Sequence, residues 1–495
     1  MKKNLILFIL VVLPMFATAQ YFGTNTHPMN KQTENIDILK YWDRNTPEEL
    51  KLYETAYKIL SERRDSDFED LVTNLEFMEL CEEYQVMILG GPILGNVSSS
   101  GVSIWVRSLT PSKIEVESSD GKGTFRSLPA YSHFKSDLTA IVKLEELKPS
   151  TSYKYKLIIN DTIEVSNENY AFKTLPSETD TSQVRIAFGS CPHRWGLGNE
   201  QLFQRIHSRD PIAMLLIGDI AVQDRENHIG MHRADYLMRD FQPAWRSFVC
   251  GMPVYTSWDD HDYFNNDDAG IPEGYTLKDK ENVRRVFQQN WNNPSYGFGE
   301  EGKGIFLRTR IGPADVIMTD NRYFRTGEKG SFLGEQQMDW LKEQLLDCKG
   351  PFIIISCGTM WSDYVSKGKD SWGVNDPEGR EEIFQLIEDN NIPGVLLISG
   401  DRHGARGFTI PRESGYAFYE FEAASLGARA AGASSLGKHD EELYGIIGVF
   451  AFGEFTFNTS KSDPEVTFRL IEEGGDIIYE KVLPLDELTP NRTLK

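Results

Sequence analysis

Residues 212–219 read IAMLLIGD, an apolar run that ends in Gly218 and Asp219. A short run that is apolar at every position is typical of a β-strand buried on both faces, as in the parallel sheets of α/β proteins. Amphipathic segments such as 334–348 separate several such runs and are predicted to be helices. The other runs are VRIAF, PVYTSW, ADVIMT, PFIII and GVLLIS, at 184–188, 253–258, 314–319, 351–355 and 394–399. The chain from residue 183 onward is therefore predicted to be an α/β domain.

Polar side chains follow these predicted strands at the points where the strands end. Because ligands of open α/β sheets bind just outside the carboxyl ends of the strands, the side chains are expected at one rim. The most acidic of these ends is SWDDHDYFNNDD at 257–268, where neighbouring carboxylates repel one another unless a cation lies between them. The candidate residues are Cys191, Asp219, Asp259, Asp260, His261, Arg322, Arg325, Asp401 and His403.

These residue types suit two metal ions that share a ligand. Asp219 can bridge two cations with its two oxygens, and Cys191 adds a thiolate that favours a transition metal. Asp260, Asp401 and His403 are suitable ligands for Fe, Mn, Zn or Ca. Two cations about 3.5–4 Å apart can hold a phosphoryl group and activate a water molecule. The pattern predicts a two-metal site that acts on phosphoryl groups.

Three further residues are candidates for the chemistry beside the metals. His261 is placed to give a proton to the leaving group. Arg322 and Arg325 can each bind phosphate oxygens through a forked guanidinium group. An alternative for Arg322 is a simple ion pair with Asp320.

Composition restricts the partners of the protein. The chain has 495 residues and a formal net charge of −22, so it lacks the basic surface that nucleic acids and anionic membranes require. An anionic substrate must therefore be held by a local positive centre, such as a bound cation. Five cysteines are too few for a disulfide framework, although a Cys191–Cys357 disulfide would remove that thiolate from metal binding.

The first residues have the form of a secretory signal peptide. Lys2 and Lys3 precede the apolar run LILFILVVLPMF, and Ala17-Thr18-Ala19 supplies small residues before a cleavage site at Gln20. The mature protein is expected to be secreted or periplasmic, without a transmembrane segment after residues 1–19 are removed.

Two segments precede the α/β domain. Residues 20–85 are expected to be mainly helical, with Thr46 and Glu49 as the two ends of a capping box. Residues 86–176 contain short alternating strands separated by turn residues, which predicts a β-sandwich. Within it, residues 147–155 resemble a corner of fibronectin type III domains.

The motifs at the strand ends resemble the PhoD-like family of metallophosphatases, also called alkaline phosphatase D. The matching stretches are FGSC (188–191), IGD (217–219), WDDHD (258–262), TDNRYFR (319–325), LGEQ (333–336), DSW (370–372) and SGDRH (399–403). The resemblance covers roughly residues 88–460 and implies a calcineurin-like αββα domain at 183–460 with a β-sandwich before it. Residues 461–495 are expected to form a separate C-terminal segment. It also implies hydrolysis of phosphate mono- or diesters.

The same resemblance implies the metals. Family members use iron together with calcium; carried over, Cys191 and Asp219 bind the iron, and Asp260 and Asp401 serve the calcium. Asp259 and His403 are also implied as metal ligands, and the resemblance does not assign either of them to a particular ion.

One position departs from the family. The family commonly has Gly-Asp-Tyr-x-Tyr-Glu after the second strand and uses the second Tyr as an iron ligand, whereas this chain has Val222 there. Either another residue takes that place, with Tyr263 and His193 as candidates, or the metal differs, with Mn and Zn as alternatives. Without a phenolate ligand the protein is expected to be colourless or weakly coloured.

Two other functions fit parts of the sequence. A non-catalytic secreted surface protein would use the β-sandwich for binding and keep a degenerate phosphatase domain as a scaffold. An enzyme of the same class would act instead on phospholipid or wall-polymer diesters. Metal content and turnover of an aryl phosphate separate the first alternative from the enzyme, and relative rates on mono- and diesters separate the second.

Overall fold

The computed structural model describes residues 20–21, 33–177, 180, 182–327, 330–364, 370–430 and 439–490. The signal peptide predicted at 1–19 lies outside the described residues. None of the helices in the described ranges combines the length and the apolar character needed to cross a membrane.

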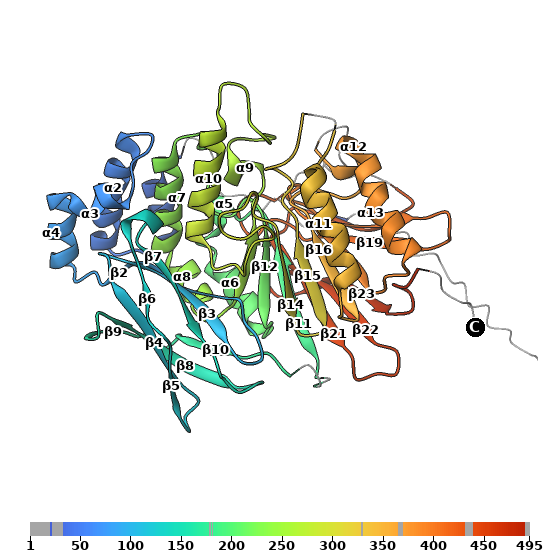
Figure 1. Ribbon diagram of the computed structural model, residues 1–495, viewed down its shortest axis with the longest axis horizontal. Coiled ribbons are helices and arrows are strands. Elements are labelled where there is room, and N and C mark those ends of the chain that lie inside the picture. The colour runs from blue at the N-terminus through green and yellow to red at the C-terminus, as the bar shows by residue number, and fades with distance from the viewer. Residues whose placement is uncertain are drawn as a thin grey trace, which may run out of the picture.

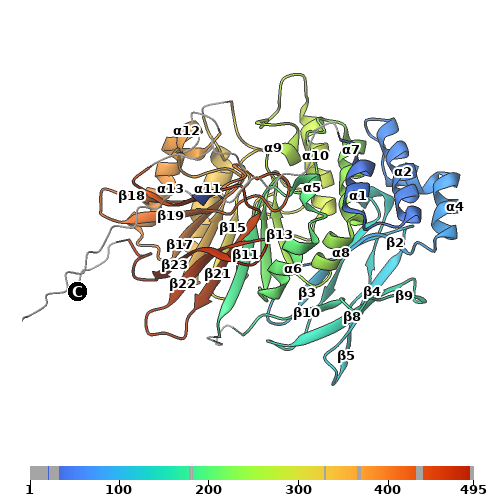
Figure 2. The ribbon, with the colours of Figure 1, turned by 180° about the vertical axis from the view of Figure 1, so that it is seen from behind.

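Two β-sheets, built mainly from residues 184–484, pack face to face (Figures 1 and 2). In spatial order, the six-stranded sheet contains β13 (Val254–Ser257), β12 (Ala213–Ile217), β11 (Val184–Gly189), β21 (Ala451–Asn458), β22 (Glu465–Glu472) and β23 (Ile477–Pro484). In spatial order, the eight-stranded sheet contains β1 (Gln20–Tyr21), β20 (Glu442–Ile447), β18 (Ala405–Pro411), β19 (Ala417–Glu422), β17 (Val395–Ser399), β16 (Phe352–Ser356), β15 (Ala314–Met318) and β14 (Leu307–Ile311). Each apolar run quoted from the sequence forms a strand of one of these sheets, as predicted.

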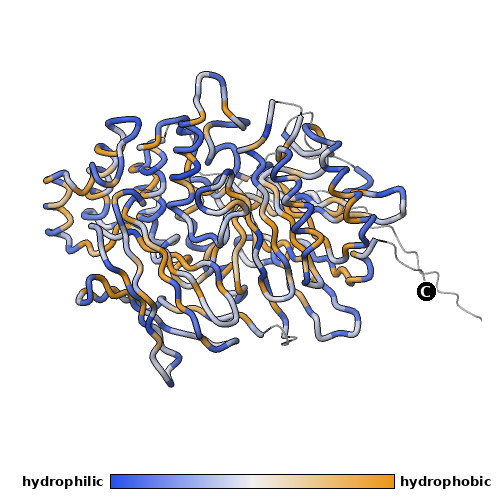
Figure 3. Tube along the Cα trace, viewed as in Figure 1, coloured by the Kyte–Doolittle hydropathy of each residue, from blue (hydrophilic) through white to orange (hydrophobic). Residues whose placement is uncertain are grey.

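Helices cover the outer face of each sheet, so the fold has four layers. The helices of this part are α5 (His193–Gly196), α6 (Glu200–Ser208), α7 (Ile229–Phe241), α8 (Pro243–Val249), α9 (Asp260–Tyr263), α10 (Leu277–Asn290), α11 (Gly334–Asp347), α12 (Trp372–Asn375) and α13 (Pro377–Asp389). Ile353 and Ile355 of β16 pack with α11 and α13, whereas Ile354 joins the core shared with the other sheet and with α6 and α8. Figure 3 shows this arrangement as apolar strands inside polar helices and loops. The predicted αββα fold class is confirmed.

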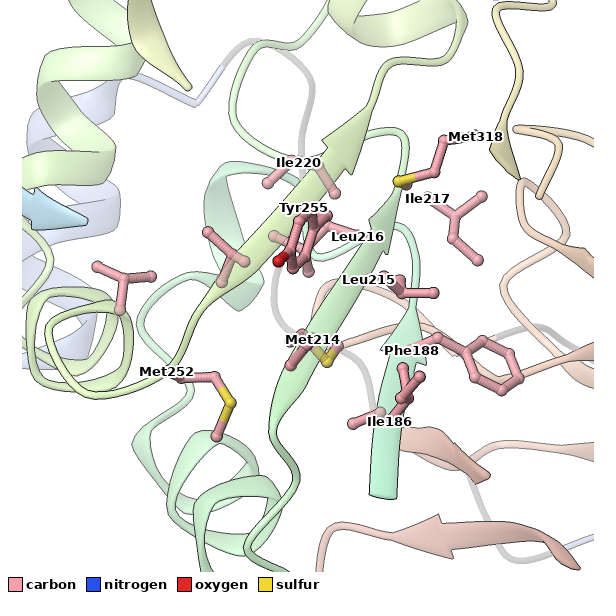
Figure 4. Packing of buried hydrophobic residues seen from close by; sticks show 14 of the residues in the cluster. Ile186, Phe188, Met214, Leu215, Leu216, Ile217, Ile220, Met252, Tyr255 and Met318 are labelled. Atoms are coloured by element: carbon pink, nitrogen blue, oxygen red, sulfur yellow. The ribbon is translucent and has the colours of Figure 1, made fainter. Parts of the chain in front are cut away.

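The strands that lead to the predicted site end close together. β11, β12 and β13 are parallel neighbours, and so are β15, β16 and β17. A Cβ on Gly218, which has a φ of +77°, would lie only 2.5 Å from the Cβ of Asp259. A Cβ on Gly400 would lie 2.8 Å from the Cβ of Ser190, so the end of β17 meets the end of β11 across the two sheets. Figure 4 shows the apolar side chains of β11, β12 and β13 that fix these strands.

A β-sandwich and a group of helices precede these sheets and lie at one end of the molecule in Figure 1. The sandwich contains β2 (Ile88–Gly95), β3 (Val102–Ser108), β4 (Lys113–Ser119), β5 (Thr124–Arg126), β6 (Ala130–Tyr131), the 3₁₀ turn η1 (Phe134–Ser136), β7 (Thr139–Leu144), β8 (Ser152–Ile159), β9 (Ile163–Val165) and β10 (Ala171–Lys173). The helices are α1 (Asn35–Trp42), α2 (Pro47–Glu62), α3 (Phe68–Thr73) and α4 (Leu75–Glu83). The capping box predicted for Thr46 and Glu49 is present, at hydrogen-bond distances of 2.9 and 3.2 Å.

The six-stranded sheet continues past residue 460. β22 and β23 pair antiparallel with each other, and β22 pairs with β21. Residues of the predicted C-terminal segment thus contribute two strands to the α/β sheet.

Candidate metal centre

The strand ends bring the predicted metal-binding residues into one cluster, in which Asp401 and His403 are half-buried and the others are buried. Their ligand atoms form three overlapping groups, and within each group all atoms lie within 4.8 Å of one another. The groups are Cys191/His193/Asp219/His403, Asp219/Asp260/His261 and Asp219/Asp259/Asp260/Asp401. Asp219 belongs to all three, so its carboxylate lies where two ions would share a ligand.

The first group combines sulfur, nitrogen and oxygen donors. The Sγ of Cys191 lies 3.6 Å from Oδ2 of Asp219, and the Nε2 of His193 lies 3.4 Å from Nε2 of His403 and 3.9 Å from the same Asp219 oxygen. Ligand–metal distances of about 2.0–2.3 Å around a tetrahedral ion place donor atoms about 3.3–3.8 Å apart, so the 3.4 and 3.6 Å spacings suit one transition-metal ion and the 3.9 Å spacing is slightly longer. The Nδ1 of His403 donates to the carbonyl of Arg429 at 2.8 Å, which leaves Nε2 as the lone-pair atom.

The cysteines of the chain are all free thiols, so Cys191 does not pair with Cys357. Burial raises the pKa of the Cys191 thiol well above its usual value, and the nearby Asp219 carboxylate acts in the same direction. A cation at the first group would oppose both effects by stabilising the thiolate.

The third group, Asp219/Asp259/Asp260/Asp401, offers carboxylate oxygens only. Burial raises the pKa of Asp259 to about 6 and that of Asp401 to about 7, although Arg322 and Arg402 beside them oppose the change. Buried carboxylates that repel one another in this way are stabilised by a hard cation, which takes oxygen ligands.

Several buried oxygens of the cluster accept no hydrogen bond from the described residues. They are Oδ1 of Asp219, Oδ2 of Asp259 and Oδ1 of Asp260. A buried carboxylate oxygen without a partner is costly, and a bound cation would supply the missing partner. The cluster therefore fits more than one metal ion.

The backbone of the cluster carries a signal that the sequence does not reveal. Five of its residues have a positive φ, which is strained for residues other than glycine: Cys191 (53°), His193 (46°), Asp219 (57°), Asp401 (77°) and His403 (58°). The turns after β11 and β17 thus have the same pattern: two strained residues with one residue between them, Cys191 and His193 in the first turn and Asp401 and His403 in the second. Strain of this kind clusters at functional sites.

His261 lies at the edge of the cluster with a carboxylate partner that the sequence analysis missed. Its Nδ1 donates to Oδ1 of Asp224 at 2.7 Å. Burial lowers the pKa of His261, but Asp219, Asp260 and Asp224 outweigh burial and raise it to about 11. In the absence of bound cations these carboxylates favour the protonated imidazole, the form that can donate a proton.

Both predicted phosphate-binding arginines contact one carboxylate. The Nη2 of Arg322 and the Nη1 of Arg325 each lie 2.7 Å from an oxygen of Asp370. Arg322 is fully buried, and its Nε donates to Asp259 at 2.6 Å. Asp320, the alternative partner of Arg322, accepts the backbone N–H of Arg322 at 3.0 Å.

The place of the family's tyrosine ligand is taken by a buried valine, Val222. Of the two candidate substitutes, Tyr263 donates its hydroxyl to the carbonyl of Gly270 at 2.5 Å. His193 instead contributes to the first ligand group, so the geometry favours His193.

The fold and this cluster define a class, the metal-dependent phosphoesterases of calcineurin-like architecture. A model of the PhoD-like phosphatase family matches residues 186–450, which is more than half of the chain. The chain belongs to the PhoD-like phosphatase family, and it is a phosphoric ester hydrolase. A second family model, a domain of unknown function named DUF7800, matches residues 85–176.

Two solved structures share the fold over most of their length. A structure described as PhoD aligns with a TM-score of 0.64 and 14% identity, covering 80% of this chain and 91% of that chain. The purple acid phosphatase PPD1 from yellow lupin (Lupinus luteus) seeds aligns with a TM-score of 0.60 and 15% identity, covering 79% and 74%. No curated protein matches the chain.

Proposed function

We propose that the protein is an exported phosphoesterase that hydrolyses phosphate mono- or diesters with two metal ions sharing Asp219. The observation that carries the proposal is that Asp219 belongs to all three ligand groups. The proposed ligands of the first ion, besides Asp219, are Cys191, His193 and His403, and those of the second are Asp259, Asp260 and Asp401. Iron and calcium are the proposed pair, with Mn or Zn as alternatives, and export rests on the signal-peptide pattern at residues 1–19.

The protein's own residues have distinct roles in this proposal. Bound ions would supply positive charge to the phosphoryl group and activate water. His261, oriented by Asp224, gives its Nε2 proton to the departing alkoxide. Arg322 and Arg325 bind phosphate oxygens by exchanging their contacts with Asp370 for the substrate.

Elemental analysis combined with a hydrolysis assay tests the proposal. Natively purified protein should contain about two metal ions per chain and release p-nitrophenol from p-nitrophenyl phosphate. A chelator should abolish the release, and added metal should restore it. A metal-free preparation that hydrolyses the ester at an undiminished rate would refute the proposal.

A further inference from the structure

The N-terminal helical segment, residues 33–84, lies outside both family models and packs against α5 and α7, the helices beside the metal centre. Helix α1 lies beside α5 and α7 and contacts both of them (Figure 2). Residue His193 begins α5, and the loop before α7 carries Asp224, the partner of His261.

One buried amide of this segment connects the two site-bearing loops. The Oδ1 of Asn35 accepts hydrogen bonds from Nη1 of Arg194 at 2.5 Å and from Nη2 of Arg225 at 3.3 Å. Its Nδ2 donates to Oδ1 of Asp235 and to the hydroxyl of Tyr53, both at 2.7 Å. A primary amide has two acceptor and two donor positions, so Asn35 uses all four.

The arginines that Asn35 joins are direct neighbours of site residues. Arg194 follows His193, and Arg225 follows Asp224. Arg225 also forms two hydrogen bonds with Asp235, at 2.7 and 2.8 Å. The amide therefore fixes the position of the His193 turn relative to the loop that orients His261.

Trp42 makes a second connection from the same segment. Its Nε1 donates to the carbonyl of Trp195 at 2.8 Å. A Cβ on Gly198 would lie 2.2 Å from the Trp42 ring, so glycine at this position allows the indole to pack there. The backbone at His193 is strained, with a φ of +46°. The Asn35–Arg194 and Trp42–Trp195 hydrogen bonds hold the two residues that follow it.

We propose that the N-terminal helical segment is a positioning element of the metal centre, in which Asn35 and Trp42 hold the Cys191–His193 turn in its ligand geometry and align Asp224 with His261. This inference rests on the proposed metal centre. Residues that orient metal ligands from behind commonly change metal affinity by about 10–100-fold when they are removed.

Titration of Co²⁺ into the metal-free full-length protein tests the proposal. Asn35→Ala should weaken Co²⁺ binding about 10-fold or more and change the visible Co²⁺ spectrum. It should also lower kcat for p-nitrophenyl phosphate and leave KM within about twofold, because the substrate contacts are unchanged. Asn45→Ala is the matched control: its amide, from the same segment, donates to the carbonyl of Phe241 at 2.7 Å, away from both loops. The control should leave Co²⁺ affinity and kcat within about twofold.

Trp42→Phe decides the question if Asn35→Ala does not fold, because it keeps an aromatic ring at this position and removes the hydrogen bond to the carbonyl of Trp195. It should weaken Co²⁺ binding in the same direction by about three- to tenfold. Folded Asn35→Ala or Trp42→Phe protein with wild-type Co²⁺ affinity, spectrum and kcat would overturn the inference. An equal loss of Co²⁺ affinity and kcat in Asn45→Ala would also overturn it, because the segment would then act only through the overall stability of the fold. Wild-type protein that binds no metal would instead refute the proposed function itself.

Discussion

The ends of β12 and β15 each carry a buried aspartate, and the two have opposite surroundings. Asp320, after β15, accepts hydrogen bonds from the indole of Trp258 and from three backbone N–H groups, at 2.7 to 3.0 Å. Asp219, after β12, has an Oδ1 that accepts no hydrogen bond from the described part of the chain. Ligand atoms of three further aspartates lie within 4.8 Å of it.

The difference distinguishes a candidate metal ligand from a buried carboxylate that the protein's own hydrogen bonds satisfy. Burial raises the pKa of Asp320, but hydrogen bonds to both of its oxygens oppose that change and leave neither oxygen without a donor. Burial raises the pKa of Asp219 well above its usual value, and the Asp260 and Asp259 carboxylates act in the same direction, so a cation is needed to stabilise its charged form. Both residues follow the end of a strand. Of the two, only Asp219 has a buried carboxylate oxygen that accepts no hydrogen bond from the described residues.

Asp219→Asn should have the largest effect. The amide cannot bridge two cations, so kcat for p-nitrophenyl phosphate should fall on the order of 10³-fold or more. The free energy of unfolding of the metal-free protein should not decrease, because one repelling carboxylate is removed. Steady-state kinetics and urea unfolding in chelator measure the two effects. Activity within tenfold of wild type would contradict the assignment.

Asp320→Asn is expected to reverse this result. The new amide N–H groups would face protein N–H donors, so the free energy of unfolding should fall by about 2–4 kcal/mol. Metal content per folded chain should stay at the wild-type value. Urea unfolding and elemental analysis of the same preparation check both statements. Loss of metal without loss of stability would show that the two strand ends do not differ as described.

Cys191→Ser should separate the two sides of Asp219. A hydroxyl is a poorer ligand for transition metals than a thiolate, so Co²⁺ or Zn²⁺ affinity should fall by about 100-fold. Calcium affinity should change little, because the oxygen-only side lacks this residue. Competition with a chromophoric chelator measures the first, and calorimetry with Ca²⁺ measures the second. Equal losses at both sites would argue against two distinct ligand sets.

The smallest expected effect concerns His232, a buried group that the protein stabilises in its neutral form. Burial lowers the pKa of His232 to about 4, and its Nε2 donates to the carbonyl of Glu226 at 2.8 Å. Since the unfolded chain binds the proton near pH 6.5, the His232 contribution to stability is lost as the pH falls below that value. The loss at pH 5 should be about 2 kcal/mol relative to pH 7.

His232→Gln tests this contribution because it keeps a donor and removes the titration. Urea unfolding of metal-free protein at pH 7 and pH 5 should show a smaller pH dependence for the variant than for the wild type. An unchanged slope would assign the acid sensitivity to other groups.

Much of the site was predictable because strand ends are visible in the sequence. Cys191, Asp219 and Asp401 follow apolar runs, and parallel strands bring such ends to one edge. Asp224 was not predictable, since it lies in a loop and reaches His261 only through the fold. The sequence predicts His193 only as a substitute ligand, and its place in the cluster depends on a strained turn that no residue pattern displays.

The sequence by itself determined the α/β character, the strand ends and the chemical types of the residues there, because continuous apolar runs and the residues that interrupt them are local properties. Only the tertiary structure decided which of two aspartates in the same kind of position is a candidate ligand. Hydrogen-bond donors reach Asp320 from as far away as Trp258, and the other carboxylates reach Asp219 from distant strands. The electrostatic environment of a buried charge is the sum over neighbours that folding assembles, and no local pattern contains that sum.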